Sequence, residues 1–206
     1  MKKKLFTLLL FLAPIACMAA HTPESAFRSL LDGNERFANG NLLHPNRSKE
    51  ARTETTTGQK PFAIILGCSD SRVSPEILFD QGIGDLFIVR VAGNVIGPLE
   101  QDSIDYGSLV LGASVIMVLG HQNCGAVDAV LHHNTQDIQA IAALIEPAIS
   151  DEGKELTLEK AIKANIRNVT EQLKKNPLIQ KLIQDNRITV MGGYYNLDSG
   201  KVEVLE

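Results

Sequence analysis

Two short motifs hold most of the residues that could do chemistry in this 206-residue chain. The first is Cys68-Ser69-Asp70-Ser71-Arg72, and the second is His121-Gln122-Asn123-Cys124-Gly125. Structural zinc sites use four protein ligands, whereas catalytic sites use three and leave one position for water or substrate. Two cysteines and one histidine form a known catalytic set. Cys68, His121 and Cys124 therefore predict a catalytic zinc site that generates a hydroxide nucleophile.

The first motif also supplies groups that a zinc-bound hydroxide needs. Asp70 lies two residues after Cys68, close enough to accept a hydrogen bond from the hydroxide. Arg72 can hold that carboxylate through a bidentate, charge-assisted pair, which keeps Asp70 ionised and oriented. Because zinc lowers the pKa of its bound water to about 7, the hydroxide is available at neutral pH. Asp70 and Arg72 are therefore predicted to be catalytic.

Two apolar, β-branched segments lead into these motifs. Residues 61–67 end at Cys68 and residues 113–120 end at His121, and both are typical of buried parallel strands. Ligands of open parallel sheets bind beyond the carboxyl ends of the strands, so both motifs stand where a site is expected. Cys124 would lie in the first turn of the following helix, where it can reach the same metal.

The remaining sequence predicts an α/β fold with a central, mostly parallel sheet flanked by helices. Thr22 and Pro23 are typical of a helix start, and an N-terminal helical arm follows, with an apolar face formed by Phe27, Leu30, Leu31 and Phe37. The other expected elements are a short helix after Pro75, a strand over 86–91, helices over 102–112 and 158–174, a strand over 187–191 and an edge strand over 202–204.

At these residues the chain resembles the beta-class carbonic anhydrases. The family's signatures, Cys-x-Asp-x-Arg and His-x-x-Cys, are both complete and in the usual order. The similarity extends from about residue 25 to residue 204 and includes segments 30–37, 84–87 and 90–94. The resemblance implies reversible hydration of carbon dioxide to bicarbonate and a proton, with one zinc per chain. It also implies a homodimer or higher homo-oligomer with the site at a two-fold interface and the N-terminal helix across a partner subunit.

The resemblance assigns roles residue by residue. It implies that Cys68, His121 and Cys124 bind zinc, and that Asp70 and Arg72 form the catalytic dyad. Three further residues match the family's substrate-binding positions: Gln59, Phe87 as an apolar pocket wall, and Gly125 through its backbone N–H.

One position departs from some members of the family. Members that close their site at low pH hold bicarbonate with a tryptophan three residues before the first cysteine, and this chain has Ile65 there and no tryptophan. Arg90 and Tyr194 match the other two residues of that bicarbonate site. The sequence favours a constitutively open site.

Composition and the N-terminal segment indicate the domain organisation and the cellular location. With 44% apolar residues and a net charge of −4, residues 21–206 fit one globular domain without a nucleic-acid surface. Residues 1–20 combine three lysines, a short apolar run and small residues, as a signal peptide does. We therefore expect a periplasmic protein with no membrane attachment after cleavage. Lipid attachment at Cys17 is disfavoured, because Pro14 stands where lipoprotein signals usually carry leucine.

Several alternatives use the same residues. Cys68 and Cys124 could form a disulfide in an exported protein, but His121, Asp70 and Arg72 would then have no role. A thiol hydrolase with Cys68 as nucleophile and His121 as base would leave Cys124 idle. A hydrolase of a carbon dioxide analogue such as carbon disulfide, or a non-catalytic zinc- or bicarbonate-binding protein, would keep the same metal ligands.

Overall fold

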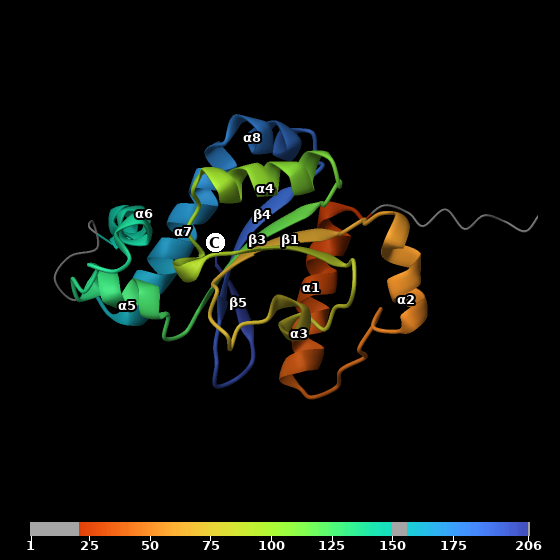
Figure 1. Ribbon diagram of the computed structural model, residues 1–206, viewed down its shortest axis with the longest axis horizontal. Helices are drawn as coiled ribbons and strands as arrows, with labels where there is room; N and C mark the ends of the chain where they lie inside the picture. Colours follow the sequence, from red (N-terminus) through yellow and green to blue (C-terminus); the bar gives the residue numbers. More distant parts are fainter. Residues whose placement is uncertain (1–20, 150–155, 206) are drawn as a thin grey trace, which may run out of the picture.

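A five-stranded sheet forms the centre of the computed structural model, which describes residues 21–149 and 156–205 (Figure 1). The strand order is β2-β1-β3-β4-β5. The first four strands in this order are parallel, and β5 pairs with β4 in the antiparallel direction at the edge. The strands are β1 (Ala63–Gly67), β2 (Leu86–Arg90), β3 (Val115–His121), β4 (Thr189–Tyr195) and β5 (Val202–Leu205).

Helices cover both faces of the sheet (Figure 1). The α-helices are α1 (Pro23–Ala38), α2 (Lys49–Glu54), α3 (Pro75–Leu78), α4 (Pro98–Leu109), α5 (Gly125–Leu131), α6 (Gln139–Ile149), α7 (Leu158–Lys175) and α8 (Pro177–Gln184). Short 3-10 helices are η1 (Thr55–Thr57) and η2 (Ala92–Asn94). Among the described helices, none combines the length and apolar character needed to cross a membrane. The expected signal peptide, residues 1–20, lies outside the described residues.

The two strands that lead into the motifs are buried along their whole length. Every residue of β1 and β3 is buried. Strands covered on both faces carry continuous rather than alternating apolar residues, which is why segments 61–67 and 113–120 are recognisable in the sequence. Both expectations are confirmed to within two residues.

Alternate side chains of these strands feed two hydrophobic cores. One core includes Ile64, Leu66, Ile116 and Val118 together with residues from α4 to α8. The opposite core includes Ile65 and residues from the α1 and α3 region. The sheet is therefore the middle layer of three, and its strands cannot slip by one residue without exchanging the two cores.

Helix α1 is part of the second core rather than a projecting arm. Leu30 is fully buried against this core, and Phe27 and Phe37 pack at its margin. The side chain of Asn34 donates to the carbonyls of Leu78 and Gly200. The apolar face of α1 is thus covered largely within its own chain. The open face of the parallel sheet itself needs a helix to cover it, and contact of α1 with a partner subunit stays a prediction.

Strand register brings the two motifs together. Gly67, the last residue of β1, pairs with Leu119 of β3 on one side and Arg90 of β2 on the other. Cys68 therefore follows β1 close to where His121 ends β3. Because parallel strands present their carboxyl ends at one edge, two segments far apart in sequence meet there.

Candidate metal centre

Three potential metal ligands converge at the carboxyl ends of β1 and β3. One ligand atom from each of Cys68, His121 and Cys124 lies within 4.8 Å of the others. All three residues are buried, with exposed fractions of 5% or less. Cys124 is the N-cap of α5, one residue earlier than the first-turn position expected from sequence. The predicted three-residue cluster is therefore present in the fold.

The orientation of His121 suits metal binding. Its Nδ1 lies 2.9 Å from the carbonyl oxygen of Gln122, so Nδ1 carries the proton and donates it. The other ring nitrogen, Nε2, is buried and has no hydrogen-bond partner among the described residues. A backbone acceptor that fixes the tautomer is the usual support of a metal-binding imidazole. The free Nε2 lone pair is directed to the cluster.

The two thiols interact strongly with each other. The closeness of the Cys124 thiol is the main cause that lowers the pKa of the Cys68 thiol in spite of its burial, with smaller contributions from the nearby His121 ring and the Gly93 N–H. The same contact with Cys68, together with burial, raises the pKa of the Cys124 thiol. Loss of a proton from one sulfur therefore disfavours its loss from the other, and a bound cation would favour loss of both. Both cysteines are free, so the disulfide alternative is not the state of this structure.

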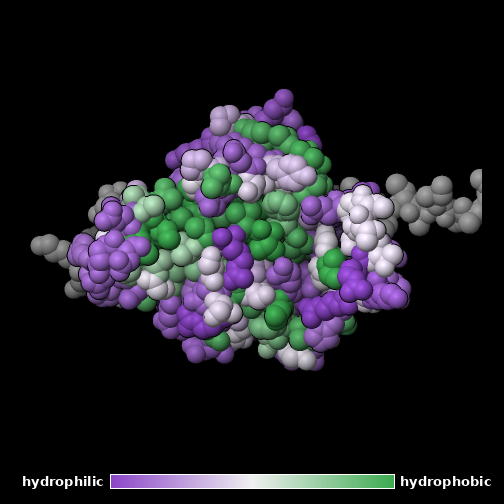
Figure 2. Space-filling view, viewed as in Figure 1, coloured by the Kyte–Doolittle hydropathy of each residue, from purple (hydrophilic) through white to green (hydrophobic). Residues whose placement is uncertain are grey.

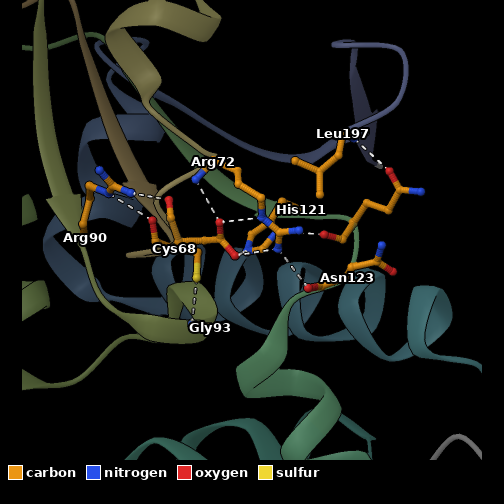
Figure 3. Close-up of polar contacts among 9 residues, drawn as sticks. Cys68, Arg72, Arg90, Gly93, His121, Asn123 and Leu197 are labelled. Atoms are coloured by element: carbon orange, nitrogen blue, oxygen red, sulfur yellow. Dashed lines mark hydrogen bonds and ion pairs between the residues drawn. The ribbon is translucent and has the colours of Figure 1, made fainter.

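Asp70 and Arg72 form the predicted bidentate pair beside the cluster (Figure 3). Arg72 Nε donates to Asp70 Oδ1 at 2.9 Å and Arg72 Nη2 donates to Oδ2 at 2.7 Å. The backbone N–H of Arg72 also donates to Oδ1. These bonds hold the pKa of the Asp70 carboxyl well below its usual value, the side-chain bond from Arg72 being the main cause. Asp70 Oδ2 lies 3.8 Å from His121 Nε2 and faces the cluster.

Arg90 anchors the backbone of the first motif from the neighbouring strand. Its Nε donates to the Cys68 carbonyl at 3.0 Å and its Nη2 donates to the Asp70 carbonyl at 2.7 Å (Figure 3). Sequence reasoning gave Arg90 only a place in a bicarbonate site and missed this role. The available signal was its position at the end of β2, in register with Gly67.

Gln122 is a second residue that supports the site and that the sequence did not indicate. Its side chain accepts from the Leu197 N–H at 2.8 Å and donates to Asp198 at 2.8 Å. It thereby ties the residue whose carbonyl orients His121 to the loop between β4 and β5. No local pattern marks such a contact, because the two segments meet only through the pairing of β3 with β4.

Comparison with known proteins identifies the family. The family model described as carbonic anhydrase matches residues 63–202, a segment that includes both motifs. The chain belongs to the carbonic anhydrase family. Carbonic anhydrase from Mycolicibacterium smegmatis is 37% identical, over 91% of this chain and 95% of that protein. Carbonic anhydrase 2 from Mycobacterium tuberculosis is 36% identical, over 87% of this chain and 91% of that protein.

Solved structures place this carbonic anhydrase in the beta class. A beta-carbonic anhydrase from Coccomyxa, solved in complex with acetazolamide, superposes with a TM-score of 0.71 and 25% identity, covering 85% of this chain and 84% of that one. The beta-carbonic anhydrase CcaA superposes with a TM-score of 0.67 and 25% identity, covering 87% and 95%. The resemblance read from the two motifs is confirmed, as is the predicted fold class.

The three expected substrate-binding residues of this carbonic anhydrase do not share one location. Gly125 begins α5 directly after Cys124, and a Cβ added to it would meet no atom within 4 Å. Gln59 is exposed in the loop before β1. Phe87 pairs with Ile64, four residues before Cys68, and thus lies roughly 13 Å along the strand from the cluster. A single chain therefore brings only Gly125 to its own metal ligands.

Phe87 has an aromatic neighbour that the sequence did not single out. The rings of Phe87 and Tyr106 lie 6.2 Å apart between centroids and are tilted by 44°. Tyr106 is 47% exposed on α4, and Val110, just after this helix, is 65% exposed. The edge strand β2 and helix α4 thus present an apolar surface on the outside of the chain.

His132, at the end of α5, is exposed and contacts Asp128 of the same helix, as a surface residue does.

Proposed function

We propose that this carbonic anhydrase interconverts carbon dioxide and bicarbonate with one zinc ion per chain. The observation that carries this proposal is the buried Cys68–His121–Cys124 cluster with the Asp70–Arg72 pair beside it. Two sulfurs and one imidazole are the donors that zinc prefers, and a set of three leaves a position for substrate. The unpartnered Nε2 of His121 fits the same ion.

Bound zinc would supply Lewis acidity that brings the pKa of a coordinated water to about 7. The protein's own contribution comes from groups that hold and orient the reactants. Asp70 Oδ2 accepts a hydrogen bond from the attacking oxygen, and Arg72 keeps this carboxylate ionised so that it can only accept. The Gly125 N–H, at the first position of α5, has no acceptor within the helix and is free to bind a substrate oxygen. Hydration releases one proton, which leaves to solvent or buffer.

We also propose an open site that low pH does not close through a bound bicarbonate. Arg90 already donates to two backbone carbonyls, so its guanidinium is engaged in holding the first motif. Ile65, which stands where some relatives carry tryptophan, is fully buried in the core and offers no donor. Tyr194 is buried, with Lys163 over its ring. The three positions thus have structural roles here.

The active form is proposed to be a homodimer or a larger homo-oligomer. Figure 2 shows hydrophobic surface across the middle of the face that carries α4. Phe87, Tyr106 and Val110 belong to the apolar surface formed by β2 and α4. A second copy seated there would cover it and would bring its own Gln59 and Phe87 to the neighbouring metal centre. Related structures include beta-carbonic anhydrases from Sordaria macrospora that are described as tetrameric.

Export to the periplasm remains a proposal that rests on residues 1–20. Mass spectrometry of the protein recovered from the periplasmic fraction of expressing bacteria would test it. We expect a chain shortened by about 20 residues, whereas full-length protein confined to the cytoplasm would contradict export.

Stopped-flow hydration of carbon dioxide by zinc-loaded protein tests the proposed reaction. We expect buffer-dependent turnover that falls about 10²- to 10⁴-fold in Asp70→Asn, because the amide offers the nucleophile a donor as well as an acceptor. Zinc content of this variant should stay near one per chain, since Asp70 lies outside the ligand cluster. Metal-replete parent protein with no hydration activity would contradict the proposal, and carbon disulfide should then be tried as substrate.

A further inference from the structure

The turn that follows β2, η2, directs a backbone N–H to Cys68, one of the three proposed metal ligands. The Gly93 N–H donates to Cys68 Sγ at 3.3 Å (Figure 3). Gly93 has φ 73° and ψ 11°, a left-handed conformation that glycine adopts without strain. A Cβ there would lie 2.9 Å from Ile145 Cδ1 and 3.3 Å from Ala126 Cβ. The turn therefore fits tightly between the first motif and helices α5 and α6.

A side chain on the distant helix α7 holds the other end of Gly93. Asn165 is fully buried, and its Nδ2 donates to the Gly93 carbonyl at 2.8 Å. The N–H and C=O of Gly93 lie in adjacent peptide planes joined at its Cα, so a bond to the carbonyl restrains the N–H together with the close packing that holds the turn at φ 73° and ψ 11°. Asn165 is thus one of the groups that restrain, through Gly93, the direction of this N–H.

Helix α7 packs against segments that hold both motifs. Ile166, the residue after Asn165, packs so closely on β3 that a Cβ at Gly120 would lie 2.5 Å from Ile166 Cδ1. Gly120 directly precedes His121. The same turn of α7 therefore contacts the strand that carries His121 and anchors the peptide that contacts Cys68.

Asn165 is a polar residue on a mostly apolar face of α7. Its neighbours on the buried face of α7 include Ile162, Ile166 and Val169, all apolar. Asn165 Oδ1 has no hydrogen-bond partner among the described residues, so the amide is buried with its acceptor unused. A leucine of similar size would avoid this desolvation cost. In the described part of the chain, the hydrogen bond from Nδ2 to the Gly93 carbonyl is the contact that the amide supplies and a leucine could not.

We propose that Asn165 is a positioning residue of the metal centre, aiming the Gly93 N–H at Cys68 Sγ and thereby adjusting the charge that this sulfur donates to the bound metal. Hydrogen bonds to ligating sulfurs withdraw electron density from them, and outer contacts of this kind tune both affinity and reactivity. The inference rests on the proposed metal site. It requires that the effect of Asn165 pass through the Cys68 sulfur rather than through overall stability.

Cobalt-substituted protein provides the test, because its thiolate-to-cobalt absorption in the near ultraviolet reports on the sulfur ligands. Asn165→Leu removes the donor and keeps the volume. The control is Thr170→Val on the same helix, since the one partner of the buried Thr170 hydroxyl within residues 21–149 and 156–205 is the Ile166 carbonyl of its own helix. We expect Asn165→Leu to shift the absorption band and to weaken cobalt binding about 10- to 100-fold in competition with a chelator. Thr170→Val should match the parent within about twofold, as expected for a change remote from the ligands.

The outcomes separate this inference from the proposed function. A parent protein that binds no cobalt would contradict the metal site itself. A folded Asn165→Leu protein with the parent's band and affinity would overturn the role of Asn165 alone. If Asn165→Leu does not fold, nuclear magnetic resonance of the cadmium-loaded parent decides. Scalar coupling between cadmium and the Gly93 amide proton, with a slowly exchanging Asn165 side-chain amide, would support the proposal, and absence of either signal would overturn it.

Discussion

The two ends of the parallel sheet differ in how much of the proposed active site a single chain supplies. At the carboxyl end, the first motif is held by Arg72, Arg90 and the Gly93 N–H, and the ligands are buried. At the amino end, Gln59 is exposed, and Phe87 is partly buried at the margin of the first core, with its ring beside the half-exposed Tyr106. The metal centre is therefore complete within a single chain, whereas the proposed substrate pocket is not.

The physical demands of the two ends explain the contrast. Metal ligands must be fixed within a fraction of an ångström, so they need several short hydrogen bonds from rigid elements of the same chain. An apolar wall for carbon dioxide needs only shape and the exclusion of water. A second subunit can supply both, because burying the apolar surface of β2 and α4 also stabilises association.

Loss of a metal ligand should have the largest effect. Cys124→Ala removes one of the two sulfurs, and we expect it to lose most of its zinc and all measurable hydration activity. Metal analysis after gel filtration, with circular dichroism to check folding, measures this. The control is His132→Ala, an exposed histidine near the site that should keep its metal and its activity. Full zinc retention in Cys124→Ala would contradict the three-ligand site.

Replacement of Arg72, the positively charged member of the Asp70–Arg72 pair, should lower activity without loss of the metal. In Arg72→Ala the pKa of Asp70 rises towards its usual value, because the main cause of its depression is gone. Asp70 then becomes protonated at higher pH than in the parent, so the acid limb of the activity profile moves up in pH. We also expect a rate loss of about tenfold or more at neutral pH.

A pH–rate profile with metal analysis at each pH checks this prediction. Arg52→Ala, on the exposed side of α2, is the matched control and should leave the profile unchanged. An Arg72→Ala enzyme with the parent's profile would show that the pair has no catalytic role.

A charge placed on the apolar surface of β2 and α4 should act through assembly. Val110 is 65% exposed there, and Val110→Asp would bury a carboxylate in the proposed interface. We expect dissociation of the oligomer to become about 10- to 100-fold easier, with activity lost in parallel and zinc retained. Sedimentation over a range of concentrations measures it, with Val110→Thr as the neutral control. A monomeric and fully active Val110→Asp protein would show that no partner is needed.

The sequence predicted the elements whose burial leaves a periodic or continuous pattern. β1 and β3 followed from uninterrupted apolar runs, and α7 was expected over 158–174 and extends over Leu158–Lys175. The grouping of Cys68, His121 and Cys124 and the Asp70–Arg72 pair could be predicted from spacing, because each set lies within a few residues of a strand end. The apolar face of α1 was predicted, but the pattern does not reveal whether the surface that it covers belongs to the same chain, and the structure shows that Phe27, Leu30 and Phe37 pack within it.

The supports of the site could not be predicted in the same way. Arg90, Gln122 and Asn165 act through backbone groups that are distant in sequence. Such contacts depend on strand register and on how α7 lies across the sheet, and neither leaves a local pattern. The types and spacing of chemistry-bearing residues therefore predict which residues could bind a metal, and only the fold shows what positions them.

Subunit complementation tests the contrast between the two ends of the sheet most directly. Asp70→Asn and Gln59→Ala are each expected to be nearly inactive as homo-oligomers. If Gln59 serves the partner's metal centre, a mixed dimer of the two has one site with both changes and one site with neither. Co-refolding equal amounts should then restore about a quarter of the parent activity, because about half of the dimers are mixed and each has one intact site. Activity that stays at the level of the separate variants, with mixed dimers shown to be present, would contradict the account.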